Sequence, residues 1–226
     1  MRVYYFTKAS NAIDDIRNQH IKLSRFSEVN DVYELLSVAV DEERENVRNA
    51  LLSAKEDNDK GCAFVSFSEC FDNPLMWGHY ADKFRGICLG FECSSDFLEQ
   101  MEYKSGCPEV DWDLQMTIDR ILKLRELLRR TKFVDWHYER EWRCFVSLPE
   151  ECDLSQEDSM LFMKFPEGMR LCEVILGCYC EESAQYIKKT LEEIGLLPSV
   201  EIFKSKISFR DFKIQKEKVD WDALKE

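Results

Sequence analysis

Glycine and proline are scarce in this chain, and long hydrophobic runs are missing. The 226 residues include 8 glycines and 5 prolines, which excludes collagen-like and low-complexity proteins. The apolar runs are only a few residues long, so we expect neither a transmembrane helix nor the core of a signal peptide. Apolar residues still make up 45% of the chain, which is enough for a sizeable core and excludes wholesale disorder.

The chain also lacks an excess of positive charge. It carries 31 Lys and Arg against 44 Asp and Glu, a formal net charge of −13. Such a balance disfavours a general role in coating DNA or RNA, because that role needs a basic surface. It favours solubility and a cytoplasmic location, and it leaves room for a local basic patch that faces one substrate.

Several binding motifs are missing as well. No CxxC pair occurs and the chain has only 3 histidines, so we expect no metal site. The chain contains no GxGxxG, no P-loop and no GxSxG. It therefore lacks the Rossmann dinucleotide fingerprint, the phosphate-binding P-loop and the nucleophile elbow of serine hydrolases. Many of the ten cysteines have apolar neighbours, which predicts reduced thiols in the core of a cytosolic protein; examples are Cys62, Cys88, Cys144 and Cys172.

The order of the elements predicts an α+β fold. Strands are expected at 2–6, 21–23, 62–68, 86–92, 141–147, 160–165, 172–176, 200–204 and 207–213. Helices are expected at 10–19, 31–57, 73–82, 112–132 and 181–195. Because helices and strands do not alternate strictly, we expect one domain (1–226) with a mixed, mostly antiparallel sheet and flanking helices. Its core would span about 3–213, followed by a charged C-terminal tail at about 214–226.

The sequence Trp-His-Tyr-Glu-Arg-Glu-Trp-Arg is the most unusual stretch of the chain. If it is extended, His137, Glu139, Glu141 and Arg143 share one face. Two carboxylates at this spacing can raise one another's pKa or divide an acid–base task. They can also simply pair with Arg140 and Arg143. The motif alone leaves both interpretations open.

A second stretch, Met-Trp-Gly-His-Tyr-Ala, begins at Met76. On a helix, Met76, His79 and Tyr80 share one face and Trp77 lies beside them. Such a stripe fits either the core or a ligand platform. His79 favours the platform, because it is a titratable group among aromatic side chains.

The expected helix at 112–132 combines an apolar stripe with a basic face. The cations of this face are Arg120, Lys123, Arg125, Arg129, Arg130 and Lys132. This pattern is typical of a solvated amphipathic helix. It also fits contact with a nucleic acid or an acidic partner at 120–132.

Together these stretches resemble a bacterial family of unknown function, DUF2971. The resemblance covers Val3 to Gly177, and the two motifs just described are its most specific parts. Tyr4-Tyr5, Asn30-Asp31 with Glu34, Phe67-Ser68-Glu69 and 86–91 complete the family's order. The family name implies no activity.

The order of elements is more distantly similar to that of ADP-ribosyltransferases. This resemblance implies a related fold, with NAD as the substrate. Tyr5 and Thr7 of the first strand would hold the ribose and the nicotinamide amide, and Trp77 or Tyr80 would stack on the nicotinamide ring. These four residues are therefore the candidate NAD-binding residues.

The same similarity implies a catalytic carboxylate. Glu139 or Glu141 would bind the ribose and stabilise the positive charge that develops as nicotinamide leaves. Arg143, like Arg85 or Arg140, would meet the pyrophosphate. His79 completes the candidate catalytic set.

Three functions therefore stay open. The first is an NAD-consuming ADP-ribosyltransferase that modifies a macromolecular acceptor, as in bacterial toxins or phage defence. The second is a non-catalytic module that binds a nucleotide or a partner, in which the glutamates are paired with arginines. The third is a carboxylate- and metal-dependent hydrolase or nuclease, which needs further acids in the same cleft; the candidates are Asp31, Glu34 and Glu69. We expect no membrane partner.

Overall fold

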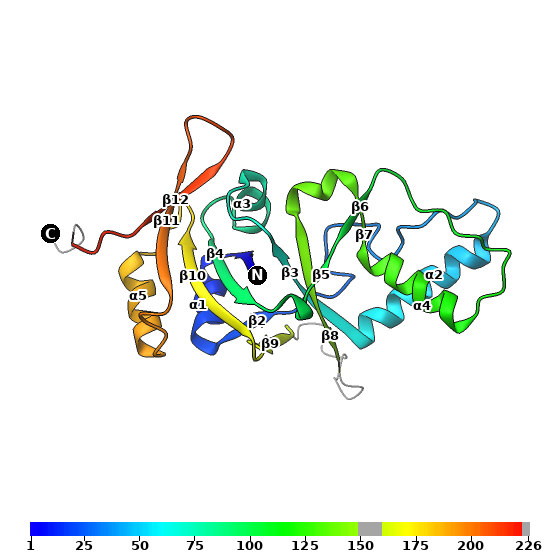
Figure 1. Cartoon of the computed structure of the whole chain (residues 1–226), viewed down its shortest axis with the longest axis horizontal. Coiled ribbons are helices and arrows are strands. Elements are labelled where there is room, and N and C mark those ends of the chain that lie inside the picture. The colour runs from blue at the N-terminus through cyan, green and yellow to red at the C-terminus, as the bar shows by residue number, and fades with distance from the viewer. Residues whose placement is uncertain (149–159, 223–226) are drawn as a thin grey trace. The chain divides into compact units, whose positions relative to one another are not determined.

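The computed structural model describes residues 1–148 and 160–222 and divides into two compact units. The first unit comprises Met1–Lys22, Phe67–Phe97 and Phe162–Glu226. The second unit comprises Leu23–Ser66 and Leu98–Leu161. The expected α+β class is confirmed, because helices flank a sheet whose strands are mostly antiparallel (Figure 1).

The first unit is built on five adjacent strands. Their order is β12 (Ile214–Lys218), β11 (Glu201–Ile207), β10 (Met169–Leu176), β4 (Ile87–Cys93) and β1 (Arg2–Thr7). All neighbours are antiparallel except β10 and β11. A parallel pair needs a crossover, and helix α5 (Ala184–Glu193) lies in this connection. Strands β4 and β10 are buried along almost their whole length, as expected of central strands.

Two helices and a small sheet complete much of this unit. Helix α1 (Ala9–Asn18) packs against α5 and buries Ala12, Ile13 and Ile16 at helical spacing. Its last residue is followed by Gln19 in the left-handed conformation, and β2 (His20–Lys22) begins at once. This strand pairs with β9 (Phe162–Lys164). The 3-10 turn η1 (Ser95–Phe97) follows β4.

Helix α3 (Pro74–Tyr80) begins where the sequence predicts. The Asn73 side chain accepts a hydrogen bond from the Leu75 amide at 2.9 Å, and Pro74 occupies the first turn. After the helix the chain turns sharply toward β4. Gly86 is required there, because a Cβ atom would lie 2.1 Å from the carbonyl oxygen of Thr7.

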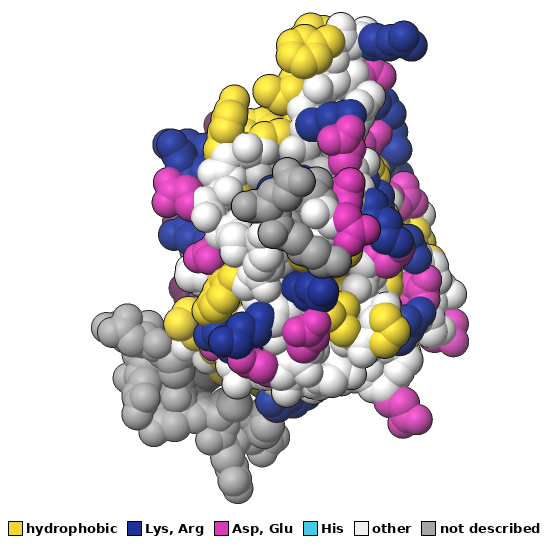
Figure 2. Space-filling view, turned by 90° about the vertical axis from the view of Figure 1, so that its left-hand side faces the viewer, with side chains coloured by type: hydrophobic (Ala, Val, Ile, Leu, Met, Phe, Trp, Pro, Cys, Tyr) yellow, Lys and Arg dark blue, Asp and Glu magenta, His cyan; other side chains and the backbone are white. Residues whose placement is uncertain are grey.

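The final hairpin differs from the sequence prediction. The expected strand at 207–213 is mostly a turn, and β12 instead occupies Ile214–Lys218 in the expected tail. Phe209 and Phe212 favour a strand by propensity, yet they are 100% and 97% exposed. The turn is held by the Ser208 amide, which donates to the Lys213 carbonyl oxygen at 3.1 Å. Apolar side chains gather at the end of this hairpin (Figure 2). Residues 223–226 of the expected tail lie outside the described part of the chain.

The second unit combines short strands with two helices. Strand β8 (Glu141–Ser147) lies between β3 (Cys62–Ser68) and β5 (Glu99–Gln100), and the end of β3 continues into the first unit, where Ser68 pairs with Tyr4. Strands β6 (Glu102–Lys104) and β7 (Thr131–Phe133) form a parallel pair. Helices α2 (Glu45–Gly61) and α4 (Ile118–Arg130) both contribute side chains to the core of this unit. The core of this unit is Phe26, Leu35, Val38, Cys62, Phe64 and Leu128, with Leu51, Leu124, Leu127 and Phe145 against it.

Two helices are shorter than predicted. The expected helix at 31–57 begins only at Glu45. Before it, the Asp31 carboxylate accepts from the Tyr33 amide at 2.9 Å, which favours a turn over a helix. The expected helix at 112–132 begins at Ile118, where the Thr117 side chain caps it, and ends at Arg130.

The expected burial of the four named cysteines is confirmed. Nine cysteines are free thiols, and those at 62, 88, 144 and 172 are buried. Of the helices in residues 1–148 and 160–222, none combines the length and the apolar character that crossing a membrane requires.

Candidate functional site

A buried network of charged side chains occupies the second unit. It contains the predicted Glu139, Glu141 and Arg143, and it adds Lys132 and Glu34. Each of these side chains is at most 5% exposed. Buried charges are costly unless they are paired and hydrogen-bonded, so the partners of each group decide what it can do.

Two cations hold three carboxylates. Lys132 Nζ donates to Oε2 of Glu139 and, at 3.0 Å, to Oε2 of Glu141. Arg143 Nε donates to Oε1 of Glu141 at 2.7 Å. The other end of the same guanidinium donates to both oxygens of Glu34, at 2.6 and 2.8 Å. The network therefore carries two positive and three negative groups in contact.

The network holds Glu141 and Lys132 in their charged forms. Burial alone would raise the pKa of Glu141, but Arg143 and Lys132 outweigh it and lower this pKa to about 2. Burial alone would lower the pKa of Lys132, but Glu141 and Glu139 raise it to about 12. Glu141 is thus a fixed anion at neutral pH.

Neutral groups complete the cage around Glu141. Ser66 Oγ donates to Oε1 of Glu141 at 2.5 Å, and the Glu141 amide donates to the Tyr103 hydroxyl at 2.8 Å. The Arg143 guanidinium lies 4.3 Å from the ring centre of Phe64, and the Lys132 ammonium lies 5.0 Å from that of Trp136.

Sequence reasoning missed part of this site. It placed Lys132 on the basic face of a helix, whereas the helix ends at Arg130 and Lys132 lies in β7. The β-prone run from Thr131 was the available signal. Ser66 and Tyr103 are ordinary strand residues, and no motif marks them.

The expected extended conformation is wrong for the first half of the motif. Residues Val134–Glu139 form a 3-10 helix, η2, and Arg140 has a φ of 44°. Only Glu141 onward is a strand. His137 therefore leaves the shared face and meets Tyr103 edge-on, with ring centres 5.2 Å apart. Glu139 and Glu141 still lie close together, because both carboxylates accept a hydrogen bond from Lys132.

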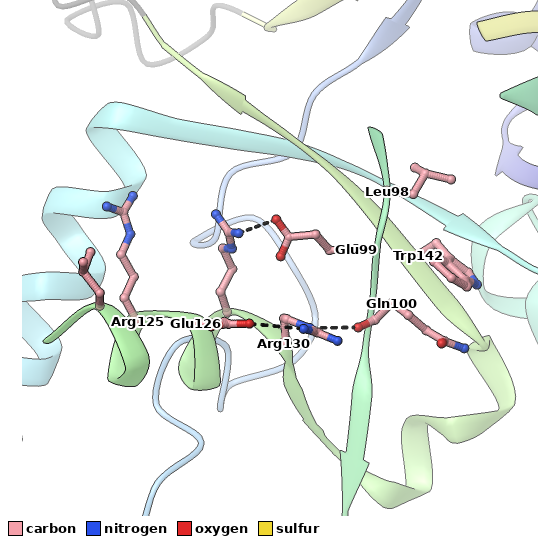
Figure 3. A pocket seen from close by; sticks show the side chains of 9 residues that line it. Leu98, Glu99, Gln100, Arg125, Glu126, Arg130 and Trp142 are labelled. Carbon is pink, nitrogen blue, oxygen red and sulfur yellow. Dashed lines mark hydrogen bonds and ion pairs between the residues drawn. The ribbon is translucent and has the colours of Figure 1, made fainter. Parts of the chain in front are cut away.

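An open groove lies elsewhere in the second unit, between α4, β5 and β8. It has a volume of about 670 Å³. Figure 3 shows Arg125, Glu126 and Arg130 from α4, with Leu98, Glu99, Gln100 and Trp142. Leu122 and Arg129 complete its lining. A groove of this size falls within the range of small-ligand sites.

The groove is positively charged in an acidic protein. It contains three arginines and two glutamates, and Arg129 pairs with Glu99 while Arg130 pairs with Glu126 at 3.3 Å. Arg125 is exposed and makes no ion pair with any residue in the described ranges 1–148 and 160–222. Its guanidinium is thus open to a ligand.

In the first unit, Tyr5 and Thr7 lie on β1 as predicted. Burial raises the pKa of Tyr5 above its usual value, as does the nearby carboxylate of Asp15, while the Thr7 hydroxyl hydrogen-bonds the phenol. The Tyr5 ring also packs edge-on against Phe67, with centres 6.2 Å apart. Tyr5 is therefore held in place by its surroundings.

The α3 residues separate into core and surface. Trp77 is fully buried, and its Nε1 donates to the Phe71 carbonyl oxygen at 2.6 Å. Tyr80 is half-buried and His79 is exposed, with their ring centres 6.1 Å apart. Their roles in binding or catalysis stay predictions, as does that of Tyr5. These candidates belong to the first unit, whereas the carboxylates Glu139 and Glu141 belong to the second.

The further acids of the third function are placed as follows. Glu34 meets Glu141 through the shared cation Arg143. Asp31 is buried in its turn, with Oδ1 accepting from Tyr33. Glu69 belongs to the first unit. An arginine thus occupies the place between Glu34 and Glu141 where a metal ion would be needed.

Comparison with known proteins gives one match. The model of a family described as "Protein of unknown function (DUF2971)" matches residues 76–144. No curated protein and no solved structure matches the chain significantly. The matched segment includes α3 from Met76 onward, all of α4, Lys132 and the carboxylates Glu139 and Glu141. The chain is therefore similar, over this segment, to a family whose name states no function.

Proposed function

We propose that the chain is a nucleotide-binding module whose ligand occupies the arginine groove of the second unit. The observation that carries this proposal is the exposed guanidinium of Arg125, which forms no ion pair with any described residue and lies beside Arg129, Arg130 and Trp142 in one groove. Arginine forks suit phosphate oxygens, and an indole suits stacking on a base. A nucleotide supplies both groups at once.

The charge of α4 supports this proposal. The helix carries five cations and two acids, although the whole chain has a net charge of −13. Its basic residues are therefore concentrated against the general trend, and they attract an anionic ligand to one place. The buried carboxylates support a binding role as well, because Glu139 and Glu141 are engaged with cations inside the unit.

The test is a titration of the purified chain with ADP, in which binding is monitored by calorimetry and by tryptophan fluorescence. Arg125→Gln and Trp142→Leu should each weaken binding about tenfold or more, which corresponds to the loss of one charged hydrogen bond or one stacking contact. Lys123→Gln is the matched control, since Lys123 lies on the same helix, outside the groove, and pairs with Asp119.

Three outcomes decide the question. Weakening by the groove variants alone supports the proposal. Equal weakening by Lys123→Gln would mean that only the general charge of α4 attracts ADP. No binding at millimolar ADP would overturn the proposal outright.

We propose NAD-consuming ADP-ribosyl transfer as the second candidate function. It is favoured by Glu141, a carboxylate that two cations keep ionised and that Ser66 holds in a fixed orientation. A fixed anion is what an oxocarbenium-like transition state requires. Because the Glu141 side chain is 4% exposed, we rank this function below nucleotide binding.

A further inference from the structure

Three metal-ligating side chains meet at the end of α1 in the first unit. Asp14 and Asp15 lie in the helix, and His20 begins β2. The left-handed Gln19 reverses the chain between them, so that His20 folds back toward the two carboxylates. One ligand atom from each residue lies within 4.8 Å of the other two.

The distances place the imidazole between the carboxylates. His20 Nε2 is 2.9 Å from Oδ2 of Asp14 and 3.6 Å from Oδ1 of Asp15. Neighbouring side chains hold both Asp14 and His20 in place. The Asn18 side chain donates to Oδ1 of Asp14 at 2.8 Å, which leaves Oδ2 facing the histidine. The Phe162 ring stacks on His20 with centres 4.1 Å apart.

Asp15 provides a second and independent observation. Its side chain is 2% exposed, and Oδ2 has no hydrogen-bond partner among the described residues. A buried carboxylate oxygen without a partner is rare and calls for an explanation, such as a bound ion. A protonated His20 would explain its contact with Asp14, but it would give Oδ2 of Asp15 no partner.

We propose that Asp14, Asp15 and His20 bind one divalent first-row transition cation of the manganese, iron or zinc class. Two carboxylates and one imidazole provide three protein ligands and leave further positions for water. The imidazole disfavours calcium and magnesium, which prefer oxygen ligands alone. A cation that Asp15 bound through both oxygens would also give Oδ2 its partner.

The surroundings allow the cation to enter. Asp14 is 54% exposed, whereas His20 is 14% and Asp15 is 2% exposed. The site thus has one ligand at the surface and two beneath it. It is independent of the arginine groove, because all three residues belong to the first unit.

The test uses Mn²⁺ and the full chain. Electron paramagnetic resonance of free Mn²⁺ should show uptake of one ion per chain, and excess Mg²⁺ should compete only weakly. Thiolates bind Mn²⁺ poorly, so the ten cysteines do not obscure the result. His20→Gln and Asp15→Asn should each weaken uptake about tenfold or more. Asp119→Asn, which removes an exposed carboxylate paired with Lys123, should leave uptake unchanged.

A second measurement needs no stable variant at the site. The chain has three histidines, so selectively labelled imidazoles give three sets of signals. Paramagnetic Mn²⁺ should broaden the His20 signals well before those of His79 and His137. Absence of uptake, equal broadening of all three histidines, or identical uptake by every variant would each overturn the proposal.

Discussion

Arg143 and Glu34 lie 109 positions apart in the sequence and form a two-point ion pair inside the second unit. Nη1 and Nη2 of Arg143 donate to the two oxygens of Glu34 at 2.6 and 2.8 Å. Both side chains are at most 2% exposed. The pair links the turn before α2 to strand β8, and Glu141 shares the same guanidinium.

Removal of this arginine should strongly destabilise the protein. Arg143→Met leaves Glu34 without its cation and leaves Glu141 with Lys132 and Ser66 as its described side-chain donors, so two carboxylates stay buried with fewer partners. Breaking a buried pair in this way costs about 3–5 kcal/mol in the free energy of unfolding. Urea unfolding, monitored by circular dichroism, measures the loss.

The control for Arg143→Met is Lys123→Met. Lys123 pairs with Asp119 at 2.9 Å, but both side chains are more than 70% exposed. Exposed pairs contribute about 0–1 kcal/mol, so this variant should unfold almost like the wild type. Equal losses in the two variants would show that the Arg143 network contributes nothing special.

The acid stability of the protein should depend on Glu141. Its pKa falls from an ordinary 4.5 to about 2 in the folded state, because Arg143 and Lys132 outweigh the effect of burial. A lowered folded-state pKa stabilises the protein above pH 4.5, and this contribution is lost as the pH falls from 4.5 to 2. The shift corresponds to about 3 kcal/mol.

Urea unfolding at a series of pH values between 6 and 2 tests this prediction. The free energy of unfolding of the wild type should fall steeply below pH 4.5. Glu141→Gln should be less stable at pH 6 and should show a shallower fall below pH 4.5, because glutamine does not titrate. Parallel curves for the two proteins would contradict the assignment to Glu141.

Trp77 should behave as a core residue. It is fully buried, its indole donates to the Phe71 carbonyl oxygen, and its ring meets Phe6 edge-on. Trp77→Ala should therefore cost about 3–5 kcal/mol in the free energy of unfolding. Leu75→Ala, on the exposed side of the same helix, should cost far less. A stable Trp77→Ala variant with impaired NAD binding would instead support a stacking role.

Local sequence patterns predicted the helices and strands that are determined by interactions between residues close in the sequence. Asn73-Pro74 located the start of α3, and the β-prone run from Cys62 located β3, because capping and strand propensity act within a few residues. The proximity of Glu139 and Glu141 was also predicted. That prediction assumed that both residues lie in one strand, whereas the strand begins only at Glu141.

Longer-range features were not predictable in this way. Lys132 carries the same charge whether it lies on a helix face or in a buried strand, and only the end of α4 decides between the two. Glu34 was a candidate ligand for a metal, yet its partner is Arg143 of a distant strand. A single sequence does not specify which opposite charges meet across such distances.

ADP-ribosyl transfer makes its own prediction. If Glu141 stabilises the charge on ribose, the wild type should release nicotinamide from NAD, and Glu139→Gln/Glu141→Gln should not. Because this double variant loses buried hydrogen bonds from Lys132 and Arg143, the rate must be compared at equal folded fraction, determined by circular dichroism.

Arg125→Gln separates the two proposed functions, since it alters the groove and leaves the carboxylate network intact. Nicotinamide release that persists in the double variant would remove both glutamates from the catalytic role. No release by the wild type, together with unchanged thermal stability in NAD, would exclude the transferase and leave nucleotide binding to be judged by the ADP titration alone.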